Sequence, residues 1–110
     1  MAEHQNLGNI IFGLGSALFE EIAHEQGQVM NPNLSDYLIP SFMDLPGRIS
    51  HELMERPGAE FHGLGETALP TVPPAVGNAV ARAIGLRVRE LPLTPERVLR
   101  AIRHRNAENR

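Results

Sequence analysis

A single carboxylate, Glu66, ends the tetrapeptide Gly63-Leu64-Gly65-Glu66. The two glycines allow the backbone to adopt positive φ or to pass close to another group. Because glutamate is ionised at neutral pH, a carboxylate held on such a loop can act as a general base. The same pattern also occurs in surface turns, where the glutamate is simply solvated. The tetrapeptide alone leaves both interpretations open.

The other motifs that could carry chemistry are incomplete. Glu21 and His24 have the i, i+3 spacing of a di-iron ligand pair, but such a site needs several long helices, which nine prolines and ten glycines disfavour. His51 and Glu52 lack the second histidine of a zinc protease helix. The chain has no cysteine, which excludes disulfides, thiolate metal sites and iron–sulfur ligation. We therefore expect no metal bound directly by these side chains.

Apolar residues at helical spacing predict three helices. A glycine follows the first two, and a hydroxyl cap followed by proline precedes the third. Gly8 and Gly15 share a face of the first helix, and each costs about 1 kcal/mol in a helix interior. That face is therefore expected to pack closely against another group, such as the chain's own sheet. The helices are expected at about 5–24, ended by Gly27; at about 73–84, ended by Gly85; and from Thr94-Pro95 onward.

Two short strands complete the expected fold, at Ile49–Glu55 and Leu86–Leu91. Residues 31–46 hold three prolines and several turn formers, and they indicate an extended loop. The sum is a small α+β domain with an N-terminal amphipathic helix, short strands and two further helices. We expect one domain over residues 1–110, with a core of about 5–102 and a basic tail at 103–110.

The net charge of −3 is unevenly distributed, because eight of the ten arginines lie in residues 82–110. This basic region has no aromatic residue for base stacking, so we expect no nucleic-acid partner. No apolar run has the length of a transmembrane helix, and the N-terminus lacks the pattern of a signal peptide. We therefore expect no membrane partner and a cytoplasmic location.

Several blocks between Gln5 and Ile102, taken in order, resemble the C-terminal part of the molybdopterin-binding large subunit of the xanthine dehydrogenase and aldehyde oxidase family, the molybdenum hydroxylases. The order and spacing of the blocks make the resemblance more specific than any one of them. The blocks are Gln5-x-x-Gly8-x-x-x-x-Gly13-Leu14-Gly15-x-Ala17-Leu18-Phe19-Glu20-Glu21, Asn31 to Pro40, Gly63 to Glu66, Pro73 to Val80, Gly85 to Val88 and Leu91 to Val98.

The resemblance implies a role for each residue of the candidate site. Glu66 would be the general base in the hydroxylation of aldehydes or N-heterocycles. Gln5 would contact the molybdenum–molybdopterin cofactor through its side-chain amide. Gly63 and Gly65 would let the loop lie against the cofactor. The glycine face of the first helix would meet the pterin and a neighbouring domain. The sequence departs from the family pattern at three positions. His62 replaces a common lysine, which exchanges a permanent charge for a pH-dependent one. Leu7 replaces a residue that is often polar, and Asn9 replaces one that is often glycine.

The chain is much shorter than the family's large subunits and begins four residues before Gln5. We therefore expect a fragment that lacks the earlier cofactor-binding segments, binds no cofactor alone and is inactive alone. Its expected partners are the remainder of the large subunit and the iron–sulfur and flavin subunits or domains, with self-association when it is alone. The alternative is a non-enzymatic module that retains this fold and binds a partner or oligomerises through the glycine face of its first helix.

Overall fold

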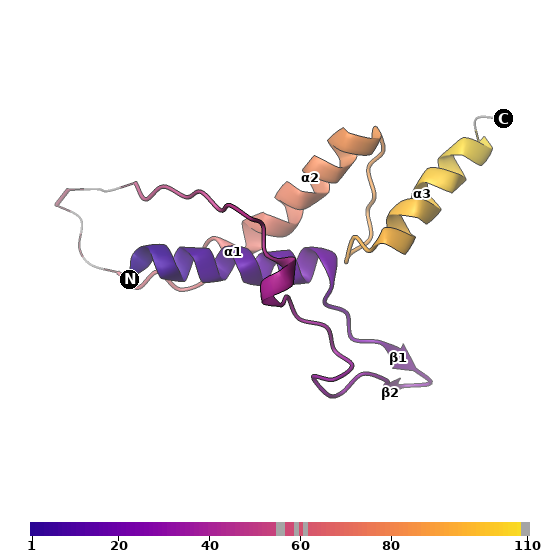
Figure 1. Cartoon of the computed structure of the whole chain (residues 1–110), viewed down its shortest axis with the longest axis horizontal. Coiled ribbons are helices and arrows are strands. Elements are labelled where there is room, and N and C mark those ends of the chain that lie inside the picture. Colours follow the sequence, from indigo (N-terminus) through magenta and orange to yellow (C-terminus); the bar gives the residue numbers. More distant parts are fainter. Residues whose placement is uncertain (55–56, 59, 61, 109–110) are drawn as a thin grey trace.

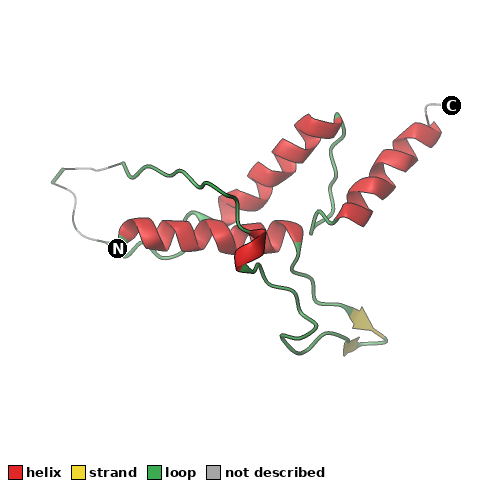
Figure 2. Ribbon diagram, viewed as in Figure 1, coloured by secondary structure: helices red, strands yellow, loops and turns green. Residues whose placement is uncertain are grey.

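The longest element of the structure is the helix α1, Ala2–Leu18, around which the other elements are arranged (Figure 1). Two further helices follow late in the chain, α2 over Val72–Ile84 and α3 over Pro95–Glu108. A two-stranded hairpin, β1 at His24–Glu25 and β2 at Gln28–Val29, completes the fold (Figure 2). The predicted class, a small domain of helices and short strands, is confirmed. The computed structural model describes residues 1–54, 57–58, 60 and 62–108.

Helix α1 ends at Leu18, earlier than the predicted boundary near His24. The carbonyl oxygen of Gly15 accepts hydrogen bonds from the backbone N–H groups of Phe19 and Glu20, both at 2.9 Å. Two adjacent glutamates follow the helix at this point. Negative charge is unfavourable at the negative end of the helix dipole, which favours an exit from the helix here.

Gly27, the predicted end of the first helix, lies instead in the hairpin turn. Gln26 and Gly27 have φ values of 48° and 82°. Positive φ at both residues of a two-residue loop is what a type I′ turn requires. The turn pairs His24 with Val29 in antiparallel register. The prediction of Gly27 as a helix end is therefore wrong, because its conformational freedom is used by the hairpin.

Neither predicted strand forms within the described residues. Residues 49–54 and 86–91 have no strand partner in the described part of the chain, and Glu55 lies outside it. Alternation of apolar residues determines which side chains share a face, but a strand also needs a neighbouring strand for its backbone hydrogen bonds. Residues 31–46 form a loop, as predicted, but it is not extended throughout, because it contains a turn at 34–36 and a 3₁₀ turn at Phe42–Asp44.

The predicted extent of the second helix and the predicted start of the third are confirmed. Helix α2 has proline in its first turn and ends before Gly85, which has φ 65°. Helix α3 begins after Thr94, whose Oγ1 accepts a hydrogen bond from the backbone N–H of Arg97 at 3.3 Å. It continues over residues 103–108, most of the predicted basic tail. Within the described residues, no helix is both long enough and apolar enough to cross a bilayer.

Helix α1 packs against the start of α2 at Gly13. A Cβ at this position would lie 3.0 Å from the carbonyl oxygen of Leu69 and would overlap the Val72 side chain. The end of α1 also holds the chain that leads into α3, because the N–H of Leu93 donates to the carbonyl of Ala17 at 2.7 Å. A carbonyl in the last turn of a helix lacks a partner within the helix, and this contact supplies one.

The two glycines predicted to share a close-packed face, Gly8 and Gly15, differ in their burial. Gly15 is buried, and a Cβ there would overlap the Glu20 carboxylate and lie 2.9 Å from Cδ of Pro40. Gly8 is exposed, and no heavy atom lies within 4 Å of a Cβ built on it. Close packing at α1 therefore involves the chain's own loop and α2 rather than a sheet, and the surface at Gly8 stays open.

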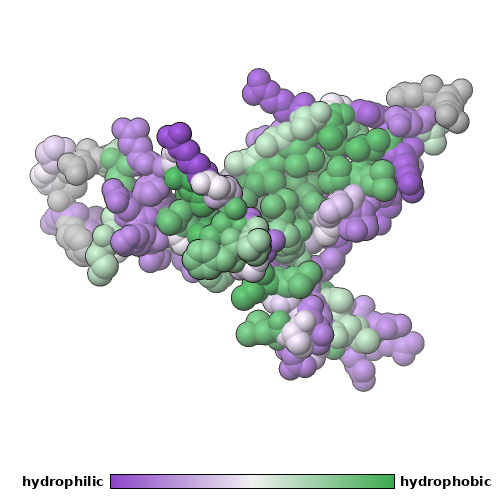
Figure 3. Space-filling view, in the orientation of Figure 1, coloured by the Kyte–Doolittle hydropathy of each residue, from purple (hydrophilic) through white to green (hydrophobic). Residues whose placement is uncertain are grey.

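The chain buries little of its surface. Its accessible area is 9046 Å² and its radius of gyration is 17.5 Å. A compact monomer of this length has roughly 6,000 Å² and about 13 Å. In the described part, the buried hydrophobic residues are Ala17 and Leu93. Apolar residues are visible over α1 and α2 (Figure 3), and such exposure is typical of a chain that packs against further protein.

Candidate functional site

Two amide side chains on α1, Gln5 and Asn9, hold one carbonyl of the Gly63–Glu66 loop. Gln5 Nε2 donates a hydrogen bond to the Gly65 carbonyl oxygen at 3.0 Å, and Asn9 Nδ2 donates to the same oxygen at 3.2 Å. Residues four apart on a helix lie on the same face, so both amides point toward the loop. The loop runs back beside the N-terminal half of α1 before it enters α2 (Figure 1). The fold thus brings Gln5 and Gly65 together across 60 residues of sequence.

The glycines of the loop behave differently. Gly65 has φ 52°, in the left-handed region that favours glycine, which confirms the expected conformational freedom at this position. Gly63 is not among the described residues with positive φ. No heavy atom lies within 4 Å of a Cβ built on either glycine. Both positions therefore present open backbone.

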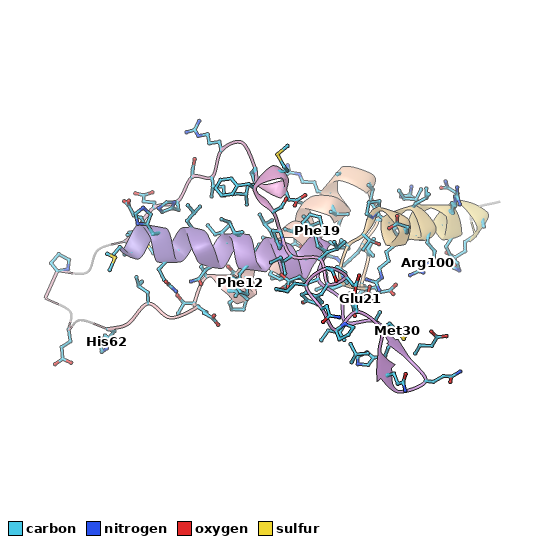
Figure 4. All side chains as sticks on the ribbon, turned by 60° about the horizontal axis from the view of Figure 1, so that its bottom comes forward. Phe12, Phe19, Glu21, Met30, His62 and Arg100 are labelled. Carbon is cyan, nitrogen blue, oxygen red and sulfur yellow. The ribbon has the colours of Figure 1, made fainter. Side chains whose placement is uncertain are left out.

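Glu66 is exposed, and its side chain makes no hydrogen bond with the described residues. Its backbone is held by a turn, because its carbonyl accepts a hydrogen bond from the N–H of Leu69 at 3.2 Å. His62 is also exposed and lies toward the opposite end of the molecule from α3 (Figure 4). A carboxylate without a partner is free to accept a proton from a group that approaches this face.

Asn9 is the site residue that the sequence does not identify. It was visible only as a departure from the family pattern, yet its relative exposure is 6%, and it is buried beside the loop. A buried amide needs hydrogen-bond partners, and the Gly65 carbonyl is one of them. The signal that could have found it is its spacing of four residues from Gln5 on a largely apolar helix.

A second polar contact lies at the other end of α1. Tyr37 Oη donates a hydrogen bond to Glu20 Oε2 at 2.8 Å, and this bond raises the pKa of Tyr37. Glu20 borders an apolar cavity of about 150 Å³. None of the predicted site residues lines this cavity. The other lining residues are Ile11, Phe12, Ile39 and Pro40.

An ion-pair network connects α3 to the body of the chain. Arg97 contacts Glu21, just after α1, and its Nε lies 3.1 Å from Oε1 of Glu90. Arg100 lies 2.7 Å from the other oxygen of Glu90, and its hydrogen bond holds the pKa of Glu90 below the usual value. Glu21 is thus engaged by an arginine rather than by His24. Among the described residues, no group of three or more His, Cys, Asp or Glu side chains could hold a metal ion.

Comparison with known proteins matches this chain to molybdenum-binding subunits. The family model for the molybdopterin cofactor-binding domain matches residues 1–46. A putative xanthine dehydrogenase molybdenum-binding subunit of Escherichia coli is 44% identical over 103 residues, 89% of this chain and 14% of that protein. The large subunit of nicotine 6-hydroxylase from Paenarthrobacter nicotinovorans is 37% identical over 111 residues, 92% of this chain and 13% of that protein.

A solved structure gives the same result at the level of the fold. The chain superposes on quinoline 2-oxidoreductase from Pseudomonas putida with a TM-score of 0.76 and 35% sequence identity. The match covers 92% of this chain and 14% of the other chain. The arrangement of the backbone described above is therefore shared with a segment of a much larger protein.

Proposed function

We propose that this chain, which belongs to the molybdenum hydroxylase family and matches one segment of its molybdenum-binding subunits, forms one wall of the molybdenum-cofactor site. In this proposal Glu66 is the general base for the hydroxylation of aldehydes or N-heterocycles. The supporting observation is the hydrogen bond from Gln5 to the Gly65 carbonyl. It joins the helix that matches the cofactor-binding domain to the loop that carries Glu66.

The loop and helix have features that suit contact with a cofactor. The open backbone at Gly63 and Gly65 allows a bound group to approach closely on the Cα side, since no heavy atom lies within 4 Å of a Cβ built on either residue. The amide oxygen of Gln5 accepts no hydrogen bond from the described residues, which leaves an uncharged acceptor at the same place. We propose that these three residues contact the cofactor. The metal would be held by the pterin rather than by side chains of this chain.

When bound, the molybdenum cofactor would supply the oxygen transfer and accept the two electrons of hydroxylation. The proposed work of Glu66 is to accept a proton on a carboxylate oxygen, because its side chain is exposed on the loop and makes no hydrogen bond with the described residues. The turn closed by Leu69 holds the Glu66 backbone, and the amides of α1 hold the preceding peptide. In this proposal the chain contributes the base, Glu66, on a loop that α1 and the turn at Leu69 hold in place.

The exposed surface supports the proposal of a partner. The accessible area of 9046 Å² exceeds that of a compact monomer by roughly 3,000 Å², whereas a standard interface buries about 800 Å² per partner. We propose that the remainder of the large subunit covers this surface. The iron–sulfur and flavin subunits or domains would then join through that remainder.

Molybdenum content tests the proposed function directly. We expect the 110-residue chain to contain no molybdenum and to oxidise neither aldehydes nor N-heterocycles when it is purified alone. Co-expressed with the remainder of a related large subunit, it should form a complex that contains molybdenum.

Gln5→Ala should lower the molybdenum content of that complex, because it removes a contact to the cofactor. Gln28→Ala in the exposed hairpin serves as the matched control. Stoichiometric molybdenum in the chain alone, or equal content in the two variants, would contradict the proposal.

Self-association of the isolated chain is a separate expectation from the same surface. Phe12 on α1 is 62% exposed, and Phe42 and Met43 are each 92% exposed. Without its partner, the chain should form dimers or larger oligomers that bury such residues. Light scattering over a range of concentrations measures this. A monomer at high concentration, with little binding of a hydrophobic dye, would contradict the expected self-association.

A further inference from the structure

The Gly65 carbonyl belongs to the same peptide group as the Glu66 backbone nitrogen. A peptide group is planar, so the direction of its C=O fixes the direction of its N–H and the position of the following Cα. The two amides of Gln5 and Asn9 both bond this one oxygen. Because a carbonyl oxygen has two lone pairs, the pair of donors satisfies its hydrogen-bonding capacity. Helix α1 thereby orients the peptide from which Glu66 projects.

The two donors are not equivalent. Gln5 is exposed, so water competes for its amide and for the same lone pair. Asn9 is buried, with a relative exposure of 6%, and water cannot readily replace its hydrogen bond. Asn9 also lies on the middle of α1 rather than on its first turn, where helices fray. Of the two contacts, the one from Asn9 is therefore the more persistent.

We infer that Asn9 is a positioning residue for Glu66: its buried amide fixes the Gly65–Glu66 peptide and so sets where the carboxylate lies. The role of the positioned carboxylate as a base rests on the proposed function. The positioning itself rests on the hydrogen bond to Gly65 and on burial alone. Without the bond, the peptide keeps only the less persistent contact from the exposed Gln5 amide, and Gly65 has no side chain to limit its backbone.

Hydrogen exchange in the 110-residue chain tests the positioning without any cofactor. The N–H of Leu69, which donates to the Glu66 carbonyl, reports on the loop, and the N–H of Val80 within α2 reports on the rest of the fold. Asn9→Leu keeps the branched shape of the side chain and removes the donor. We expect exchange at Leu69 to quicken by roughly 3- to 10-fold, the factor for one lost hydrogen bond, with Val80 unchanged.

The matched control is Asn6→Leu, on the same helix, since Asn6 makes no side-chain hydrogen bond with the described residues. It should leave both amides unchanged. If Asn9→Leu fails to fold, the unmodified chain still decides the question: the side-chain amide protons of Asn9 should exchange more slowly than those of Asn6. Equal exchange at Leu69 in Asn9→Leu and the parent, or equal side-chain exchange of the two asparagines, would overturn the inference.

Kinetics of the complex with the remainder of a large subunit separates positioning from general structural damage. Asn9→Leu should lower kcat by about 10- to 100-fold with KM and molybdenum content unchanged, because the base is displaced while the binding groups remain. Unchanged kcat would overturn the link from the loop to catalysis, provided that Glu66→Gln is itself inactive. If Glu66→Gln is fully active, the proposed function fails, while the hydrogen-exchange result still decides whether Asn9 holds the loop.

Discussion

Glu66→Gln should lower the turnover of the complex between this chain and the remainder of a large subunit by roughly 10²- to 10⁴-fold, the usual effect of losing a general base. Glutamine keeps the size and the hydrogen-bonding shape of glutamate but cannot accept the proton. Because the side chain of Glu66 has no hydrogen-bond partner among the described residues, its replacement should not disturb the loop. Steady-state rates and molybdenum content, measured on the same preparation, give the result.

The matched control for this variant is Glu25→Gln, which makes the same chemical change in the exposed hairpin. It should leave both the rate and the metal content at the level of the parent. A rate for Glu66→Gln within a few-fold of the parent would mean that Glu66 is a solvated turn residue, the interpretation that its sequence motif also allows. A large loss of molybdenum would instead assign Glu66 to cofactor binding.

Gly13→Ala should destabilise the fold by about 1–3 kcal/mol, the typical cost of overpacking. The added Cβ would lie 2.8 Å from Cγ2 of Val72 and 3.0 Å from the carbonyl oxygen of Leu69. The second contact is with backbone and cannot be relieved by a rotamer change, so α1 and α2 must move apart. Urea unfolding followed by circular dichroism, at one fixed protein concentration, measures the free energy of unfolding.

Gly8→Ala is the control with the opposite expected sign. It makes the same change on the same helix, but no heavy atom lies within 4 Å of the added Cβ. Alanine should therefore stabilise the isolated chain by up to about 1 kcal/mol, through helix propensity alone. If the two variants shift the free energy of unfolding in the same direction, the close contact at Gly13 is not what holds α1 against α2.

Features whose causes lie within a few residues, or in a family pattern, could be predicted from the sequence alone. Gly85 ends α2 with a positive φ, and Thr94 caps α3, because each signal acts on the turn of helix next to it. Gly65 adopts the left-handed conformation that its loop context predicts. The order of the family blocks also identified the relatives that the comparisons found.

Features that depend on distant partners were set by the tertiary structure. Residues 49–54 and 86–91 carry the alternation of strands but find no neighbouring strand in the described part of the chain, and so they remain irregular. Helix α1 stops at Leu18, beside a loop that packs on Gly15 and an arginine of α3 that pairs with Glu21. The contact of Asn9 also depends on a distant partner, because its hydrogen bond to Gly65 spans 56 residues of sequence. Periodicity along one segment does not show which distant carbonyl a buried amide will bond.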